Sequence, residues 1–164
     1  MMDFARWLTA GLLLVNQVLA ATIVLTTFSL VIYLLTHNFR SAVARAFCAL
    51  LAFVLVVYMG DVALVEVNSQ QAAIHWLKFQ WIGIALVPAA YLDFSDALLR
   101  TTHAGVRWRQ IAVWISHAAS IVLVGLVYFS ELLVYDGVYS SRAAYLSAGP
   151  LFWVFALYYV QSLL

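Results

Sequence analysis

Several ionisable side chains lie inside or beside long apolar stretches of this chain, where charge is costly. Lys78, Asp93, Asp96 and Arg100 belong to one such stretch, 76–100, which reads WLKFQWIGIALVPAAYLDFSDALLR. On a helix of about 100° per residue these four share one stripe, with alanines in its middle. The stripe is predicted to face protein or water, and its alanines let another backbone approach closely. We therefore expect the central helix of a bundle here.

Two carboxylates precede this stretch. Asp61 and Glu66 lie near the end of another apolar stretch, and a short link separates them from Lys78. Antiparallel neighbouring helices would bring Lys78 level with either acid. An Asp61–Lys78 or Glu66–Lys78 pair would either line a polar ligand pocket or ion path that opens outward, or fix helix register close to the membrane surface.

The carboxylates at the other end of the stretch have different expected partners. Asp96 and Arg100 are four residues apart with the acid first, which favours an ion pair on a helix. Asp93 lies one turn deeper, and a proton or cation role would need a matching polar group in another span. The polar residues expected near that level are Asn38, Arg40 and Arg45. We expect one of them to pair with Asp93, so that helix-end anchoring explains the site.

Two further residues have a possible chemical role. Pro88 removes the backbone hydrogen bond to Ile84, which predicts a kink that opens a small cavity or acts as a flexing point. His117 lies inside an apolar stretch, where a hydrogen bond to a neighbouring hydroxyl is the simpler explanation. A bis-histidine haem site would need a second imidazole at the same depth, and the other histidines lie at span ends or in links.

Other chemistry finds no support in the sequence. Lys78, the only lysine, is too close to the edge of its stretch for a retinal Schiff base. The sequence contains no nucleophile–base pair, Gly-rich phosphate loop or metal-ligand cluster. We expect no cofactor and no enzyme activity in this stretch of chain.

Composition places the chain in the membrane. Of its 164 residues 66% are hydrophobic and 9% are charged, and its mean hydropathy is +1.01, whereas soluble domains carry about 25% charged residues. The net charge of +1 and the lack of a basic face exclude a nucleic-acid partner. The only cysteine, Cys48, cannot form an internal disulfide. The lipid bilayer is the expected environment.

Five apolar stretches are long enough to cross a bilayer, which takes about 20 residues. We predict an all-α, polytopic transmembrane bundle, a single domain over 1–164, with spans at about 8–35, 42–65, 74–99, 111–129 and 148–164. The long link 130–147 contains Tyr135-Asp136-Gly137, which is typical of a turn. No Lys or Arg follows the last apolar stretch, so we expect the chain to continue beyond 164.

The distribution of arginine predicts the orientation. Arginines occupy the links after the first and third stretches, whereas the link after the second has none and the link after the fourth has a single one. Positive charge favours the cytoplasm, so the N-terminus is predicted outside. The expected location is a bacterial inner membrane.

The central stretch resembles the third helix of the seven-helix N-terminal sensor region of bacterial histidine kinases. That family has a Trp/Gly motif, a mid-helix proline, and aromatic and small polar residues before a basic link. The corresponding residues are Trp81, Gly83, Pro88, Tyr91, Phe94, Ser95 and Arg100. The order of spans, the outside N-terminus and the longer outer link are similar as well.

The resemblance implies a membrane sensory input module that passes a signal to a cytoplasmic effector. Any kinase or cyclase activity would lie in a further C-terminal part, and no binding residues can be carried over. The alternative is an accessory membrane subunit of a larger energy-transducing or transport complex, whose partners would be other membrane subunits. A third hypothesis, half of a transporter, predicts dimerisation and an ion-dependent effect of Asp61 or Lys78 substitutions.

Overall fold

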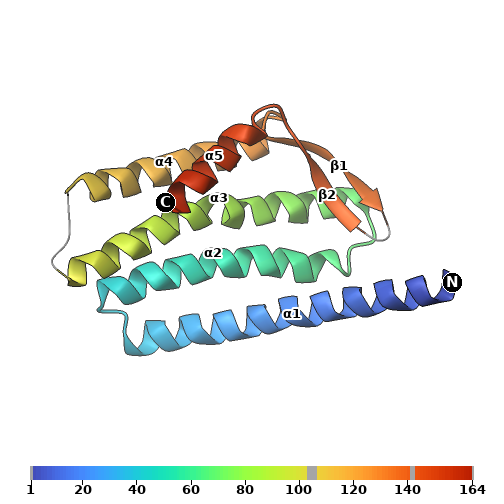
Figure 1. Ribbon diagram of the computed structural model, residues 1–164, viewed down its shortest axis with the longest axis horizontal. Helices are drawn as coiled ribbons and strands as arrows, with labels where there is room; N and C mark the ends of the chain where they lie inside the picture. The colour runs from blue at the N-terminus through green and yellow to red at the C-terminus, as the bar shows by residue number, and fades with distance from the viewer. Residues whose placement is uncertain (1, 103–106, 141–142, 164) are drawn as a thin grey trace.

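Four long helices lie side by side in a row, and a fifth, shorter helix and a β-hairpin pack on α3 (Figure 1). This computed structural model describes residues 2–102, 107–140 and 143–163, with the backbone alone for 2–6, 136–140, 143, 144 and 163. The elements in chain order are α1 (Met2–His37), α2 (Ala42–Leu64), α3 (Gln70–Thr101), α4 (Arg107–Phe129), β1 (Val134–Ser140), β2 (Ala143–Ala148) and α5 (Phe152–Leu163).

The prediction of a helical membrane bundle is confirmed, and four of the predicted spans match helices long and apolar enough to cross a bilayer: Trp7–His37, Ala42–Leu64, Gln70–Thr101 and Arg107–Phe129. The fifth prediction is not confirmed. Residues 143–148 form a strand, and α5 begins only at Phe152 and has 12 residues.

Serine residues define where α2 and α3 begin. Ser41 and Ser69 have extended backbone conformations, and their hydroxyls accept hydrogen bonds from the amides of Ala44 and Ala72. Serine is favoured at this position because it satisfies an amide that the first helical turn leaves unpaired. The two links before these helices are short, so α1, α2 and α3 are antiparallel neighbours (Figure 1).

The α2–α3 contact is close because glycine lies at it. A Cβ atom at Gly83 would lie 2.5 Å from the carbonyl oxygen of Phe53 and 2.7 Å from Cγ2 of Val57. One at Gly60 would overlap the side chain of Gln80. Small residues at an interface let helix backbones approach in a membrane, where packing replaces the hydrophobic effect between helices. The expectation that α3 is the central helix agrees with its contacts to α2, α4, α5 and both strands.

The hairpin is a feature that the sequence did not predict. β1 and β2 are antiparallel, with a register shift between Tyr135 and Val138. The turn predicted at 135–137 is therefore wrong: these residues belong to β1 and form a bulge, a feature that also tolerates glycine and extra residues. The amides of Gly149 and Leu151 donate to the carbonyls of Leu133 and Leu132, which joins the residues just before α5 to the link between α4 and β1.

The hydrophobic core lies where α3, α4, α5 and the hairpin meet. Its buried members are Ala85, Leu123, Val127, Leu133, Val134 and Phe155. Trp81 of α3 makes edge-to-face contacts with Phe152 and Phe155, an arrangement that aromatic quadrupoles favour. The outer surfaces of α1 and α4 are apolar and exposed, as expected for lipid-facing helices.

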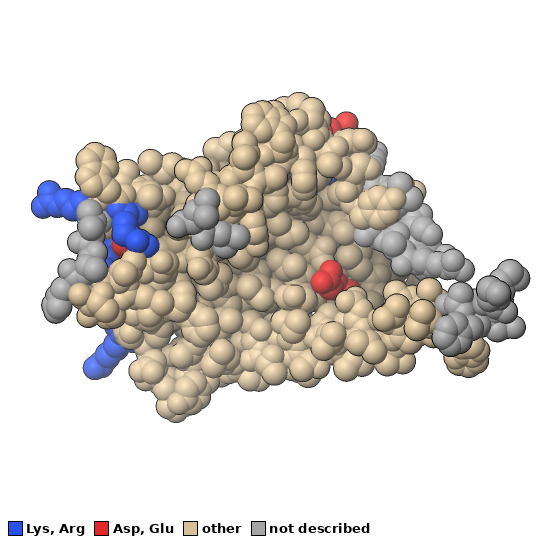
Figure 2. Space-filling model, viewed as in Figure 1, with Lys and Arg blue, Asp and Glu red and all other residues tan. Residues whose placement is uncertain are grey.

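The described arginines gather at one end of the bundle, which we call the arginine-bearing end. It comprises the last turns of α1 and α3 and the first turns of α2 and α4 (Figures 1 and 2). Its described arginines are Arg40, Arg45, Arg100, Arg107 and Arg109.

Candidate functional site

A buried amide joins α3 to the last third of α2. The Nε2 of Gln80 donates to Oδ1 of Asp61 at 2.6 Å and to the carbonyl of Val57 at 3.1 Å. Gln80 is 6% exposed, and Gly60 leaves the space that its side chain fills. An amide that bonds a carboxylate and a backbone carbonyl on one neighbouring helix fixes the register of the two helices.

The partner expected for Asp61 was therefore wrong. Asp61 bonds Gln80, and within the described part of the chain neither Lys78 nor the side chain of Glu66 forms an ion pair or a hydrogen bond. Glu66 is exposed beyond the end of α2, and Lys78 is half-buried on α3. The ion pair on which the expected polar pocket or ion path depended does not form. The contact that fixes the register of α2 and α3 is made by Gln80 instead.

A second buried network surrounds the level of Pro88. The Ser120 hydroxyl donates to the carbonyl of Ala85 at 2.7 Å and lies 2.8 Å from the Tyr158 hydroxyl. That hydroxyl also lies 2.7 Å from Oγ of Ser116. Three helices, α3, α4 and α5, are thus joined by one chain of hydroxyl groups.

Sequence reasoning did not single out these hydroxyl groups as a network. Ser116 and Ser120 are four residues apart and hence on one face of α4, which was a usable signal. Tyr158 lies 38 residues from Ser120, and nothing local to it indicates the contact.

Pro88 does not end α3, which runs unbroken from Gln70 to Thr101. The proline is itself buried, and so are its neighbours Ala89 and Ala90. Pro88 lines none of the four hollows described for this bundle, and the cavity expected beside it stays a prediction. The role of Pro88 as a flexing point also stays a prediction.

A charged cluster closes the arginine-bearing end of α3. Asp96 Oδ2 accepts from Arg100 Nε at 2.8 Å and lies 2.6 Å from its Nη2, which confirms the expected i,i+4 pair. Arg109 of α4 donates to Ser95 Oγ at 3.1 Å, and its Nε lies 3.8 Å from Asp96 Oδ1. With its amide oriented to satisfy both groups, Gln110 accepts from the Arg100 guanidinium. These contacts join the ends of α3 and α4.

The cluster is incompletely bonded. The Asp96 side chain is 3% exposed, yet its Oδ1 has no hydrogen-bond partner among the described residues. The 3.8 Å to Arg109 is too long for a hydrogen bond. A buried carboxylate oxygen without a donor is unfavourable, so this point of the fold is open to change.

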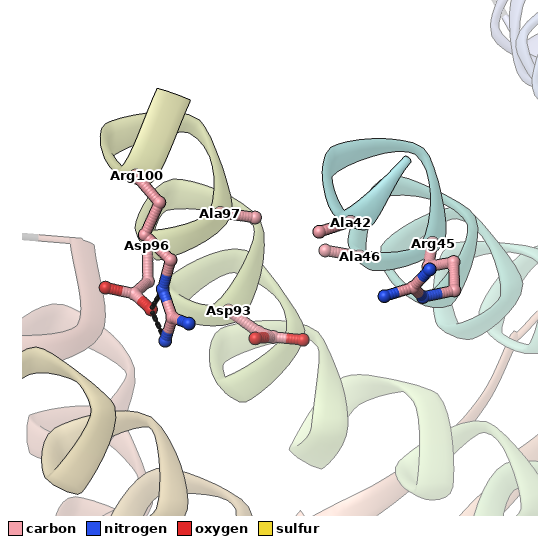
Figure 3. Close-up of a pocket in the computed structure, with 7 residues that line it drawn as sticks. All are labelled: Ala42, Arg45, Ala46, Asp93, Asp96, Ala97 and Arg100. Carbon is pink, nitrogen blue, oxygen red and sulfur yellow. Dashed lines mark hydrogen bonds and ion pairs between the residues drawn. The ribbon is translucent and has the colours of Figure 1, made fainter. Parts of the chain in front are cut away.

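Asp93 is less engaged still. Its carboxylate forms no hydrogen bond and no ion pair with any residue that the structure describes, so the pairing expected for it is not present. It projects into a hollow of about 240 Å³ between α2 and α3 (Figure 3). This α2–α3 hollow is lined by Ala42, Arg45, Ala46, Asp93, Asp96, Ala97 and Arg100.

A second hollow, of about 350 Å³, lies on the other side of α3, and we call it the α3–α4 hollow. It shares Asp93, Asp96 and Arg100 with the first, and His117 lines it together with Gln110, Val113 and Trp114. Nδ1 of His117 lies 2.9 Å from the carbonyl of Val113 in its own helix. The bond expected from His117 to a hydroxyl is thus replaced by one to the backbone. The structure brings four predicted residues, Asp93, Asp96, Arg100 and His117, to this end of α3.

The chemistry of the site is that of charged side chains. The described residues contain no cluster of three or more His, Cys, Asp or Glu side chains able to hold a metal ion. What the end of α3 offers is an unpaired carboxylate, a partly satisfied one, and guanidinium groups from three helices.

Comparison with known proteins gives one result. Neither a search of curated proteins nor a search of solved structures gives a match. The sequence model of one family, described as the N-terminal 7TM region of histidine kinase, matches residues 18–164. The match extends from the middle of α1 through α5 and includes every residue of the site described above. The chain belongs to the family of N-terminal seven-transmembrane regions of histidine kinases.

Proposed function

We propose that this chain is a membrane-embedded sensory input module that transmits a signal to a cytoplasmic effector. Its family supports an input role, and the observation that carries the proposal is the position of α3. This helix contacts α2, α4, α5 and the hairpin. It also bears an incompletely bonded charged cluster at one end. A helix that contacts its neighbours along its length and ends in unsatisfied charge is well placed to report a change in their packing.

The proposed orientation places the arginine-bearing end in the cytoplasm. Lysine and arginine favour that side of a membrane, and Arg40 of the α1–α2 link and the arginines on either side of the α3–α4 link lie at this end (Figure 2). The N-terminus, at the opposite end of the bundle (Figure 1), is then outside. The membrane would be the inner membrane of a bacterium, and the charged end of α3 would face the effector.

The proposed mechanism is a shift of α3 about Pro88. The shift would move the ends of α3 and α4 together, because Arg109 connects α4 to Ser95 and Asp96. A stimulus drives such a shift only by binding the two packings with different affinity. The module itself performs no catalysis in this proposal, and phosphorylation would belong to the effector.

Two measurements on the native protein test the proposal. The first is the intact mass of the membrane-extracted protein, which should exceed 18.3 kDa because the effector is expected in the same chain. The second is labelling of native membranes with radioactive ATP, which should give an acid-labile phosphohistidine on the same band. Asp93→Asn should alter the extent of labelling, whereas Glu66→Gln, which removes an exposed carboxylate outside the site, should not.

The accessory-subunit hypothesis remains the second candidate, and the broad exposed apolar faces of α1 and α4 favour it because partner helices could cover them. It predicts a mass that matches 18.3 kDa and co-purification with other membrane chains at fixed stoichiometry. That result, with no phosphohistidine and no effect of Asp93→Asn on any output, would contradict the sensory proposal.

A further inference from the structure

The α2–α3 hollow holds two opposite charges that do not pair with each other. Asp93 of α3 and Arg45 of α2 both line it, and both side chains project into the space between the helices (Figure 3). No ion pair joins them within 4.0 Å, although Asp96 and Arg100 of the same hollow are paired. We propose that this hollow binds a small zwitterion with a primary ammonium group and an anionic group.

The ammonium end of the ligand follows from Asp93. This carboxylate is half-buried within an apolar helix and accepts no hydrogen bond from any described residue. A carboxylate in such surroundings is strongly unfavourable without donors. A primary ammonium supplies three N–H donors and the opposite charge, and such charge-assisted bonds are about twice as strong as neutral ones.

The anionic end follows from Arg45. Its Nη1 donates to the carbonyls of Phe39 and Arg40 at 3.3 and 3.2 Å, which anchors the guanidinium against the α1–α2 link. The other guanidinium nitrogens form no hydrogen bond or ion pair with any described residue, and they belong to a side chain that lines the hollow. A held guanidinium with free donors suits a carboxylate or phosphate oxygen.

The remaining lining limits the class of ligand. Asp96 and Arg100 neutralise each other, so the uncompensated charges are one negative and one positive. A simple amine would leave Arg45 unbound, and a simple anion would meet the carboxylate of Asp93. The walls are alanines, Ala42, Ala46 and Ala97, and the volume of about 240 Å³ suits a compound the size of an amino acid.

Two sources can supply this chemistry, a free zwitterion and the headgroup of phosphatidylethanolamine, and the order of charges favours the free compound. Asp93 lies eight residues before the end of α3, about 12 Å inward, whereas Arg45 lies three residues into α2, about 4.5 Å. The ammonium must therefore lie deeper than the anion. In the lipid the phosphate is the deeper group, so its headgroup would enter in the wrong order.

The inference deepens the proposed function, on which it rests for its biological meaning, because the hollow would receive the stimulus beside the end of α3 that reports it. Binding and signalling are nevertheless separate measurements. If the native protein binds no zwitterion but Asp93→Asn still alters phosphohistidine labelling, the ligand proposal fails and the sensory proposal stands. If the zwitterion binds but native membranes give no phosphohistidine, the sensory proposal fails and the ligand proposal stands.

The test measures binding of β-alanine to the native protein in nanodiscs of phosphatidylglycerol alone. Calorimetry and the melting temperature are the readouts. β-Alanine should bind saturably and raise the melting temperature, whereas ethylamine and propionate, its two halves, should not. Asp93→Asn and Arg45→Gln should each weaken binding about tenfold or more, the loss expected for a charge-assisted hydrogen bond. Glu66→Gln and Arg40→Gln are the matched controls and should bind normally.

Four results would overturn the proposal. If ethylamine or propionate binds as tightly as β-alanine, one charge is sufficient for binding. Normal binding by both Asp93→Asn and Arg45→Gln, each folded by circular dichroism, would place the ligand elsewhere. If instead the two variants lower the melting temperature without ligand and do so non-additively, Asp93 and Arg45 pair directly. Stabilisation by added phosphatidylethanolamine without β-alanine, lost in Asp93→Asn, would overturn the free ligand and assign the same chemistry to the lipid.

Discussion

Polar side chains at the middle of α3 have hydrogen-bond partners, whereas similar side chains at its arginine-bearing end lack some or all of theirs. In the middle, Gln80 and Ser120 each bond a side chain and a backbone carbonyl of a neighbouring helix. At the end, Asp93 has no partner and one oxygen of Asp96 has none, within the part of the chain that is described. Residue type does not separate the two regions, because Asp61 is an acid in an apolar helix just as Asp93 is. What differs is whether a neighbour supplies a donor.

This difference separates fixed packing from responsive packing. A polar group with all its bonds made holds helices in one register. A group with bonds unmade gains from any rearrangement or ligand that supplies them. Under the proposed function, the stability of the fold and the response to a stimulus would depend on different levels of one helix, and substitutions at each level should tell them apart.

The largest effect is expected for Arg100→Gln. This change leaves the nearly inaccessible carboxylate of Asp96 with only Arg109, 3.8 Å away. Breaking one side of a buried pair costs about 3–5 kcal/mol, and we expect about 2 kcal/mol here because Arg100 is itself half exposed. The measurement is the free energy of unfolding in detergent. Lys78→Gln removes an unpaired cation from the same helix and should cost much less; equal losses would show that Arg100 does not stabilise Asp96.

Gly83→Ala should be the next largest. Its new methyl group would meet the backbone of Phe53 and the side chain of Val57, and overpacking of this kind costs about 1–3 kcal/mol. Gly125→Ala on α4 is the control, since nothing lies within 4 Å of a Cβ there, and it should be neutral or mildly stabilising. Equal stability of the two variants would mean that α2 and α3 separate easily.

The Asp61–Gln80 contact should give a smaller but specific effect. A double-mutant cycle with Asp61→Leu and Gln80→Leu should show a coupling energy of about 0.6–1.7 kcal/mol, the range measured between membrane helices. A parallel cycle on Glu66 and Lys78 should show none, since neither side chain has a partner among the described residues. Coupling between Glu66 and Lys78, with none between Asp61 and Gln80, would show that the Asp61–Gln80 contact does not hold α2 against α3.

The smallest effect on stability is expected for Asp93→Asn. Asp93 makes no bond that the change would break, so the free energy of unfolding should stay within about 0.5 kcal/mol. The same variant should nevertheless change the phosphohistidine labelling of native membranes. A large loss of stability would place Asp93 with the fixed contacts of the middle and remove the contrast between the two regions.

The sequence was sufficient where the signal is local. Four spans follow from length and hydropathy, and the Asp96–Arg100 pair follows from spacing within one helix. The contacts of Gln80 and Tyr158 cross between helices, and an amide or a phenol in an apolar stretch does not indicate which neighbour it faces. The hairpin was missed because β1 includes an Asp-Gly pair that is typical of turns, and its bulge absorbs that pair within a strand.

The packing around Pro88 determines what form a signal through α3 can take. Ala85 and Ala89 are 0% exposed and Ala90 is 1% exposed, so the face of the helix that these residues form has no accessible space into which it could bend by degrees. Densely packed interiors move between distinct arrangements rather than deforming continuously. Any output that α3 controls should therefore switch between two levels as the stimulus rises, with the fraction of switched molecules, rather than the angle of the helix, encoding its strength.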